Sequence, residues 1–236
     1  MGEHHKVDAG GIGLAYQAWG PPDGPPLVLL HALGENGSDW GNVAPAFGRQ
    51  RRVYAPDLRG HGQSDWPGNY SVELMRDDIL GFLDALALDR VDLIGHSLGG
   101  MVAYLLAAEY PERLEKLILE DVSAPLPRKA GVPARPDGQL LFDWEMVLAI
   151  RRQIDNPDPA WLEQLSQVSA ETLVLAGGPA SHILQDRVAE LATRIPGARL
   201  ETIQAGHLIH HAQPAAFTGA AVRFLDRAAT AKPEHP

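Results

Sequence analysis

Short apolar runs alternate with longer amphipathic stretches along most of the chain. The runs predict six strands, over 26–31, 52–56, 91–95, 117–119, 172–176 and 199–203. Continuous apolar runs of this length are typical of strands that are buried on both faces of a parallel sheet. Residues 11–19 alternate more regularly between apolar and polar, which predicts an antiparallel edge hairpin with residues 6–7.

Amphipathic segments with a period near 3.6 predict helices at 72–86, 101–110, 185–195 and 214–227. Ser71 is a suitable N-cap for the first of these helices, and Pro111 ends the second. The alternation of strands and helices predicts an α/β fold. We expect a mostly parallel, doubly wound sheet of about eight strands with helices on both faces.

One segment interrupts this alternation. Residues 125–138 contain four prolines and two glycines, which predicts a loop, and two short helices are expected at 139–153 and 159–167. The segment is too long for a single crossover. We therefore expect a small helical lid at 123–169, above the carboxyl edge of the sheet. The α/β core then comprises 1–122 and 170–228, and 229–236 form a flexible tail.

Composition narrows the function classes. The chain has 236 residues, which fits one α/β core, and 30 acidic against 20 basic residues give a net charge of −10. A surface with that balance repels phosphate backbones, which disfavours nucleic acid as a partner. The absence of cysteine excludes disulfides, thiolate metal sites and a cysteine nucleophile. No apolar run is long enough to span a membrane, and Met1–Lys6 lacks the plan of a secretory signal, so a cytoplasmic protein is expected.

A nucleophile motif lies at the end of the third predicted strand. Gly95-His96-Ser97-Leu98-Gly99 has the pattern G-x-S-x-G between a predicted strand and a predicted helix. A sharp strand-to-helix turn strains the serine backbone, so its neighbours must be small. The serine hydroxyl is then exposed at the carboxyl edge of the sheet, beside the first amides of a helix.

With this motif the sequence resembles the α/β-hydrolase fold superfamily, and three further segments match. His31-Ala32-Leu33-Gly34 is similar to the family's oxyanion loop, with Ala32 in place of the usual glycine. Residues 57–65, DLRGHGQSD, resemble the loop that follows the next strand, and Gly206-His207 follows the last strand, where the family carries its catalytic histidine. The resemblance covers residues 10–122 and 170–227 and implies a hydrolase that uses neither a cofactor nor a metal.

Ser97 requires a general base, and an imidazole can both accept and return a proton near neutral pH. His207 has the expected position in the chain. His31, His61 and His96 belong to the loop motifs and are expected to hydrogen-bond backbone groups. A metal site formed by His207 with the nearby His210 and His211 is disfavoured, because the surrounding sequence lacks carboxylates.

The acid that orients His207 is less clear. The family usually carries it in the loop after the strand at 172–176, where this chain has Ala180. Some members place the acid at the end of the preceding strand, and Asp121 occupies that position. Glu120 would point to the opposite face of an extended strand, and Asp186 is a weaker candidate. The alternative for Asp121 is a purely structural role as a loop cap.

The backbone N–H groups of Leu33 and Leu98 are expected to form the oxyanion hole. Four aromatic residues are candidates to shape the pocket, with packing of the lid onto the body as the alternative: Trp40, Phe142, Trp144 and Trp161. Arg128, Lys129 and Arg135 are expected to be solvated loop charges rather than a clamp for a carboxylate. Asp57, Arg59 and Asp65 are expected to tie loops together.

These features predict a serine hydrolase that cleaves a small carboxylic ester or lactone through an acyl-enzyme. Its partner is that small molecule, and the sequence does not indicate an oligomeric state. Hydrolysis of C–C bonds or amides and perhydrolysis use the same triad and remain alternatives. A non-enzymatic ligand-binding protein with a hydrolase-like fold is a further alternative. Serine at position 97 argues against epoxide hydrolase and haloalkane dehalogenase chemistry, which uses aspartate.

Overall fold

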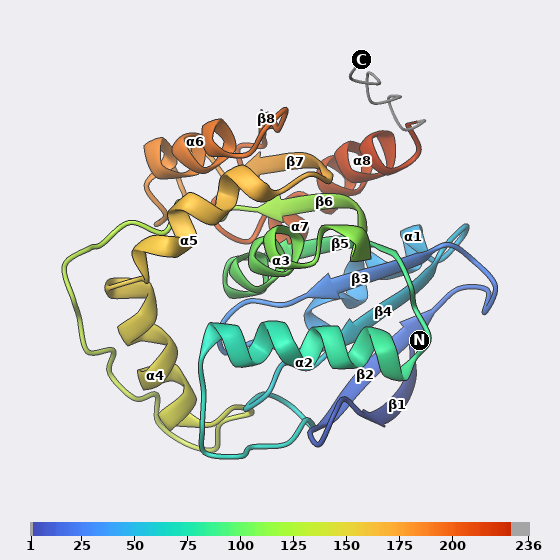
Figure 1. Ribbon diagram of the computed structural model, residues 1–236, viewed down its shortest axis with the longest axis horizontal. Helices are drawn as coiled ribbons and strands as arrows, with labels where there is room; N and C mark the ends of the chain where they lie inside the picture. The colour runs from blue at the N-terminus through green and yellow to red at the C-terminus, as the bar shows by residue number, and fades with distance from the viewer. Residues whose placement is uncertain (1, 228–236) are drawn as a thin grey trace.

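The computed structural model describes residues 2–227, so the tail predicted at 229–236 lies outside the described residues. A single eight-stranded sheet has the order β1-β2-β4-β3-β5-β6-β7-β8 (Figure 1). β1 and β2 pair antiparallel, as do β2 and β4, and every other pair is parallel. The strands are β1 (Glu3–Asp8), β2 (Gly13–Trp19), β3 (Pro26–Leu30), β4 (Arg52–Pro56), β5 (Val91–His96), β6 (Leu114–Glu120), β7 (Glu171–Ala176) and β8 (Arg199–Thr202).

All six predicted strands and the edge hairpin are therefore confirmed. The α-helices are α1 (Ala44–Phe47), α2 (Val72–Ala85), α3 (Leu98–Glu109), α4 (Trp144–Asp155), α5 (Pro159–Gln164), α6 (Gln185–Arg194), α7 (Ile209–Ala212) and α8 (Pro214–Leu225). The short 3₁₀ helices are η1 (Gly37–Asn42), η2 (Pro111–Arg113) and η3 (Leu165–Gln167). The Ser71 hydroxyl accepts a hydrogen bond from the Leu74 N–H, so the predicted N-cap is confirmed. α1 and α7 were not predicted, because four residues are too few to show a helical period.

Helices cover both faces of the sheet, and each face has its own apolar core. Val28 and Leu30 of β3 pack with α2, α3 and α6 on one face. Leu27 and Leu29 of the same strand pack with α1 and α8 on the other. This alternation follows from the period of two along a strand. It also confirms the doubly wound architecture.

The segment predicted as a lid borders the cavity and also contributes side chains to the core. α4 lies on the side toward which the parallel strands point (Figure 1), and its N-cap is Asp143. Trp161 of α5 and Leu165 of η3 are buried in the same apolar core as α2 and α3. Met146 and Ile150 of α4 are buried in this core as well, so both halves of the segment pack onto the body. Among residues 2–227, no helix is both long enough and apolar enough to cross a membrane.

Candidate active site

The turn from β5 into α3 holds Ser97 in a strained conformation. Ser97 has a φ of 52° and a ψ of −111°, and it is the N-cap residue of α3. A Cβ atom on Gly95 would lie 2.5 Å from the Gly99 carbonyl oxygen, and one on Gly99 would lie 2.3 Å from the Leu30 carbonyl oxygen. Both distances are too short for any side chain. The two glycines of the motif are therefore what lets the serine sit in so tight a turn.

His207 and Asp121 meet beside this turn, although 86 residues separate them in the chain. The His207 Nδ1 atom lies 2.8 Å from the Asp121 carboxylate. This fully buried carboxylate also accepts hydrogen bonds from the Gly177 N–H at 2.9 Å, from the Gln185 amide at 3.1 Å and from the Ser181 hydroxyl. Burial alone would raise the pKa of Asp121, but these hydrogen bonds, with that of His207 the largest, hold it below its usual value. Asp121 is therefore an ionised acceptor that fixes the orientation of the imidazole.

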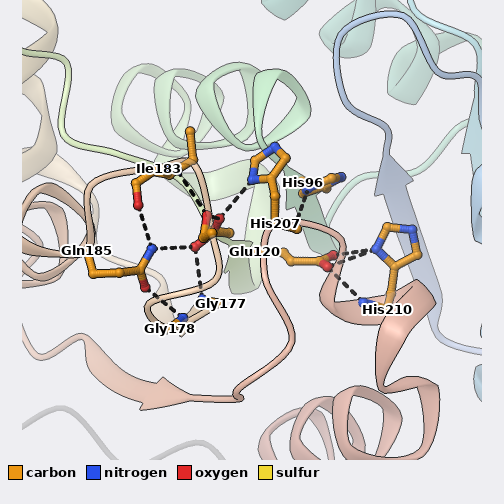
Figure 2. Close-up of polar contacts among 10 residues, drawn as sticks. His96, Glu120, Gly177, Gly178, Ile183, Gln185, His207 and His210 are labelled. Carbon is orange, nitrogen blue, oxygen red and sulfur yellow. Dashed lines mark hydrogen bonds and ion pairs between the residues drawn. The ribbon is translucent and has the colours of Figure 1, made fainter.

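The loop after β7 is where the family usually carries the acid of the triad. In this chain the loop supplies hydrogen-bond donors to Asp121 instead of a carboxylate. Gly177 and Ser181 belong to this loop, and Gln185 starts α6. Figure 2 shows Gln185 between Gly178 and Ile183, each of which it contacts through a hydrogen bond. Asp186 is exposed at the start of α6 and contacts neither Ser97 nor His207.

Ser97 and His207 line one cavity of about 370 Å³, together with Leu33 and Asp121. Within residues 2–227 the Ser97 hydroxyl makes no hydrogen bond to His207. In hydrolases without substrate this bond is often long and tightens only when substrate binds. The arrangement brings Ser97, the candidate nucleophile, together with His207 and Asp121 at the carboxyl edge of the sheet.

Two histidines fix the loop after β3 that carries Leu33, one of the two predicted oxyanion donors. His61 accepts a hydrogen bond from the Gly34 N–H at 3.1 Å and contacts the Arg59 carbonyl through Nδ1. His31 donates to the Ala32 carbonyl at 2.8 Å and accepts from the Leu58 N–H at 2.9 Å. Burial lowers the pKa of both imidazoles, which favours the neutral form that donates through one nitrogen and accepts through the other.

Leu33 of the same loop lines the cavity beside Ser97. Leu98 is the first residue of α3, where an N–H group has no acceptor within the helix. These two positions can present N–H groups to an oxyanion. Asp57, Arg59 and Asp65 tie loops together as predicted: Asp57 accepts from the Gly37 N–H at 2.7 Å and Asp65 from the Gly13 N–H at 2.7 Å, while Arg59 pairs with Asp78.

A second group of titratable side chains, which includes Glu120 and His210, lies next to His96 (Figure 2). His210 contacts the Glu120 carboxylate through Nδ1 at 2.8 Å. Its Nε2 lies 3.1 Å from Asp39. Burial would lower the pKa of His210, but the two carboxylates raise it to about 9, so His210 is an imidazolium. Asp39 also pairs with His211. The expectation that His210 and His211 have no carboxylates nearby is therefore wrong, because Asp39 and Glu120 come from distant parts of the chain.

These residue types are close enough together to be considered as metal ligands. Each carboxylate is already paired with an imidazole, however, so the arrangement is that of an ion-pair network. His96 links this network to the candidate site, because its Nε2 donates to the His207 carbonyl at 2.9 Å. Burial lowers the pKa of His96 to about 4, so it is neutral.

The four aromatic residues predicted to shape the pocket do not line the cavity, and this prediction needs correction. Trp40 is fully buried and stacks on His210 at a ring-centroid distance of 4.3 Å. Trp161 is buried in the core, and Phe142 and Trp144 are half-buried against it. Large apolar side chains gain more from the closed core than from an open cleft. These aromatic side chains pack onto the body, which was the alternative to shaping the pocket.

The cavity is lined instead by smaller apolar side chains and by polar groups that the sequence did not single out. Arg151 of α4 and His182 of the loop after β7 are two of the polar groups, and Met101 and Ile154 are two of the apolar ones. Arg128 also lines the cavity, and its Nε donates to Asp155 at 2.6 Å. It is therefore not a freely solvated loop charge. Lys129 and Arg135, its neighbours in the predicted loop, are exposed.

The fold is that of the α/β hydrolases, and sequence comparison agrees. The model of the alpha/beta hydrolase fold family matches residues 25–148, so the chain belongs to this family. Many of its relatives are hydrolases, and the chain is an enzyme of this kind.

Three similar proteins indicate the range of the family. The sn-1-specific diacylglycerol lipase ABHD11 of Mus musculus is 28% identical, covering 85% of this chain and 81% of the relative. The enol-lactonase of Burkholderia xenovorans LB400 has a TM-score of 0.83 at 26% identity, covering 95% of this chain and 100% of that structure. A thermophilic esterase of Thermogutta terrifontis has a TM-score of 0.78 at 26% identity, covering 94% and 98%.

Proposed function

We propose that the protein is a serine hydrolase that cleaves a small carboxylic ester or lactone through an acyl-enzyme. The observation that carries this proposal is the position of His207, which is bound to a buried carboxylate and lines the same cavity as Ser97. A strained serine, a base and an orienting acid are the three parts that nucleophilic acyl transfer requires. None of the proposed steps uses a cofactor.

In the first half of the reaction the Ser97 oxygen attacks the carbonyl carbon, and its proton moves to His207 Nε2. The carbonyl oxygen becomes an oxyanion, which the N–H groups of Leu33 and Leu98 stabilise. Asp121 stabilises the imidazolium that forms. His207 then donates the proton to the departing alkoxide oxygen as the carbon–oxygen bond breaks, which leaves an ester on Ser97.

In the second half water attacks this ester and gives a proton to His207. The second tetrahedral intermediate collapses, the Ser97 oxygen leaves, and His207 returns the proton to it. The acid product is released and the resting enzyme is restored. For a lactone, the alkoxide of the first half stays attached to the acyl group, and one hydroxy acid is the product.

A small substrate is supported by the size of the cavity, about 370 Å³. Esters and lactones are supported by the similar structures of an enol-lactonase and an esterase. We also propose that the protein is cytoplasmic and that this small molecule is its substrate. We expect it to bind neither nucleic acid nor a membrane.

The test is turnover of 4-nitrophenyl acetate and of a panel of small lactones by the parent protein and by Ser97→Ala. The parent should hydrolyse members of this panel, and Ser97→Ala should lose activity by at least about 10⁴-fold. Ser123→Ala is the matched control, because Ser123 lines the same cavity but does not occupy the strained turn. Turnover that persists in Ser97→Ala would contradict the proposal. A parent that binds such ligands without turnover would favour the non-enzymatic alternative.

A further inference from the structure

Two arginine side chains form part of the wall of the Ser97 cavity. Arg128 follows β6 in the loop before α4, and Arg151 lies on α4. About a third of each side chain is exposed, 30% for Arg128 and 33% for Arg151. Neither residue belongs to the proposed catalytic machinery, so their presence beside the nucleophile needs another explanation.

The hydrogen-bonding capacity of these guanidinium groups is largely unused. Arg128 donates from Nε to Asp155, and its Nη2 is buried without a partner among the described residues. Arg151 donates no hydrogen bond to any residue in 2–227, and its Nε is likewise buried without a partner. Its nearest acidic atom is an Asp155 oxygen at 3.7 Å. Each guanidinium has five N–H donors, and most of them make no hydrogen bond to a described residue.

The charges around this wall leave a net positive charge. Asp155 is buried and is the acidic partner of both arginines. Its Oδ2 also accepts from the Gly131 N–H at 3.2 Å, so its capacity as an acceptor is partly taken. Two guanidinium groups against one carboxylate leave one positive charge. The remaining acidic group on the wall outside the candidate triad is Glu35, which belongs to the loop after β3 rather than to the arginine side.

We propose that Arg128 and Arg151 form a subsite for a carboxylate of the substrate, so that the enzyme prefers esters or lactones that carry a free carboxylate. This inference rests on the proposed function and names its substrate class. Guanidinium groups bind carboxylates through parallel, charge-assisted hydrogen bonds. One unbalanced positive charge matches a carboxylate monoanion better than a phosphate dianion. Asp155 holds Arg128 in position through Nε and leaves both outer nitrogens without a hydrogen bond to a described residue.

The test compares pairs of substrates in which one member carries a free carboxylate and the other does not. The first pair is 4-nitrophenyl hemiglutarate and the 4-nitrophenyl ester of monomethyl glutarate, in which the acyl part is charged or neutral. The second pair is 4-carboxyphenyl acetate and phenyl acetate, in which the leaving group is charged or neutral. The readout is the ratio of kcat/KM for the charged ester to that for the neutral ester. This ratio cancels any general loss of activity.

The variants are Arg128→Gln, Arg151→Gln and Lys129→Gln. Lys129 is the matched control, because it is exposed, adjacent to Arg128 and carries the same charge. In the parent at least one substrate pair should favour the charged ester by about tenfold or more. Each arginine variant should lower that ratio by about tenfold, mainly through KM, and Lys129→Gln should leave it unchanged.

Arg128→Lys separates charge from folding, because it keeps the positive charge opposite Asp155 and loses the guanidinium fork. It should lie between the parent and Arg128→Gln. A charged-to-neutral ratio near one for both pairs in the parent would overturn the inference, as would a ratio that Lys129→Gln lowers as much as the arginine variants do. Turnover of the neutral esters and its loss in Ser97→Ala test the proposed function separately. Failure of the subsite and failure of the serine mechanism are therefore distinguishable.

Discussion

Replacing Asp121 by asparagine removes the charge that orients His207 and changes little in size. The carboxylate is fully buried and accepts four hydrogen bonds, from His207, Gly177, Ser181 and Gln185. An asparagine amide offers one acceptor oxygen and one donor nitrogen, so at least one of these donors would face another donor. If the nitrogen faces His207, the imidazole is pushed into the tautomer that cannot accept the serine proton.

The expected loss in kcat is about 10⁴-fold, which corresponds to about 5 kcal/mol of activation free energy. The mismatched hydrogen bonds should also lower the free energy of unfolding by about 1–3 kcal/mol. The assay is kcat for 4-nitrophenyl acetate together with urea unfolding, so that lost catalysis is separated from lost folding. Asp186→Asn, at an exposed aspartate on α6, is the matched control and should retain parent activity. A folded Asp121→Asn protein with kcat within about tenfold of the parent would refute the role of Asp121.

Three further predictions concern the turn, the buried ion pair and the oxyanion loop. Gly99→Ala should cost at least about 1–3 kcal/mol of stability in thermal unfolding, because its Cβ would lie 2.3 Å from the Leu30 carbonyl oxygen. Gly41→Ala is the control and should cost far less, because no atom lies within 4 Å of its Cβ. Equal losses of stability in the two variants would contradict the steric argument. The pKa of His210 is about 9 in the folded protein, against an ordinary value of 6.5. Protonated His210 therefore stabilises the fold by roughly 3 kcal/mol below pH 6.5, and this contribution is lost as the pH rises through 9. Urea unfolding should show this loss of stability in the parent and not in His210→Asn. Gly34→Pro should lower kcat by about 100-fold or more. Gly34 has a φ of 86° and donates its N–H to His61, and proline can do neither. A kcat like that of the parent would argue against an oxyanion role for this loop.

Most of the fold could be predicted from the sequence because each strand is marked locally. Runs such as Pro26–Leu30 need only a window of a few residues to be recognised, and Ser71 and Pro111 mark helix ends by their own chemistry. The four-residue helices α1 and α7 carry no such period. They form where the chain packs on the sheet, and only the tertiary structure shows this.

The nucleophile turn was also predictable, because its residue types follow from steric limits within five consecutive positions. The partners of Asp121 were not. Gly177, Ser181 and Gln185 lie more than fifty residues along the chain and have no pattern that marks them as donors to one carboxylate. The choice of Asp121 over position 180 depended on the family resemblance.

The cavity walls were the least predictable part of the site. Trp40 was expected at the pocket because it follows the oxyanion loop, yet its large side chain is fully buried and stacks on His210. Arg151 is one charge among several on an amphipathic helix, so nothing in the sequence separates it from Arg152. Which helix faces meet across a cleft depends on the crossing of distant elements. A single sequence does not encode that information locally.

The most direct test of the account is covalent labelling of the native protein with a fluorophosphonate, followed by mass spectrometry of the intact chain and of its peptides. Because the proposed mechanism activates one serine, the account predicts a single adduct, on Ser97, that is absent in Ser97→Ala. A folded parent protein that takes up no label, or an equal amount of label in Ser97→Ala, would contradict it.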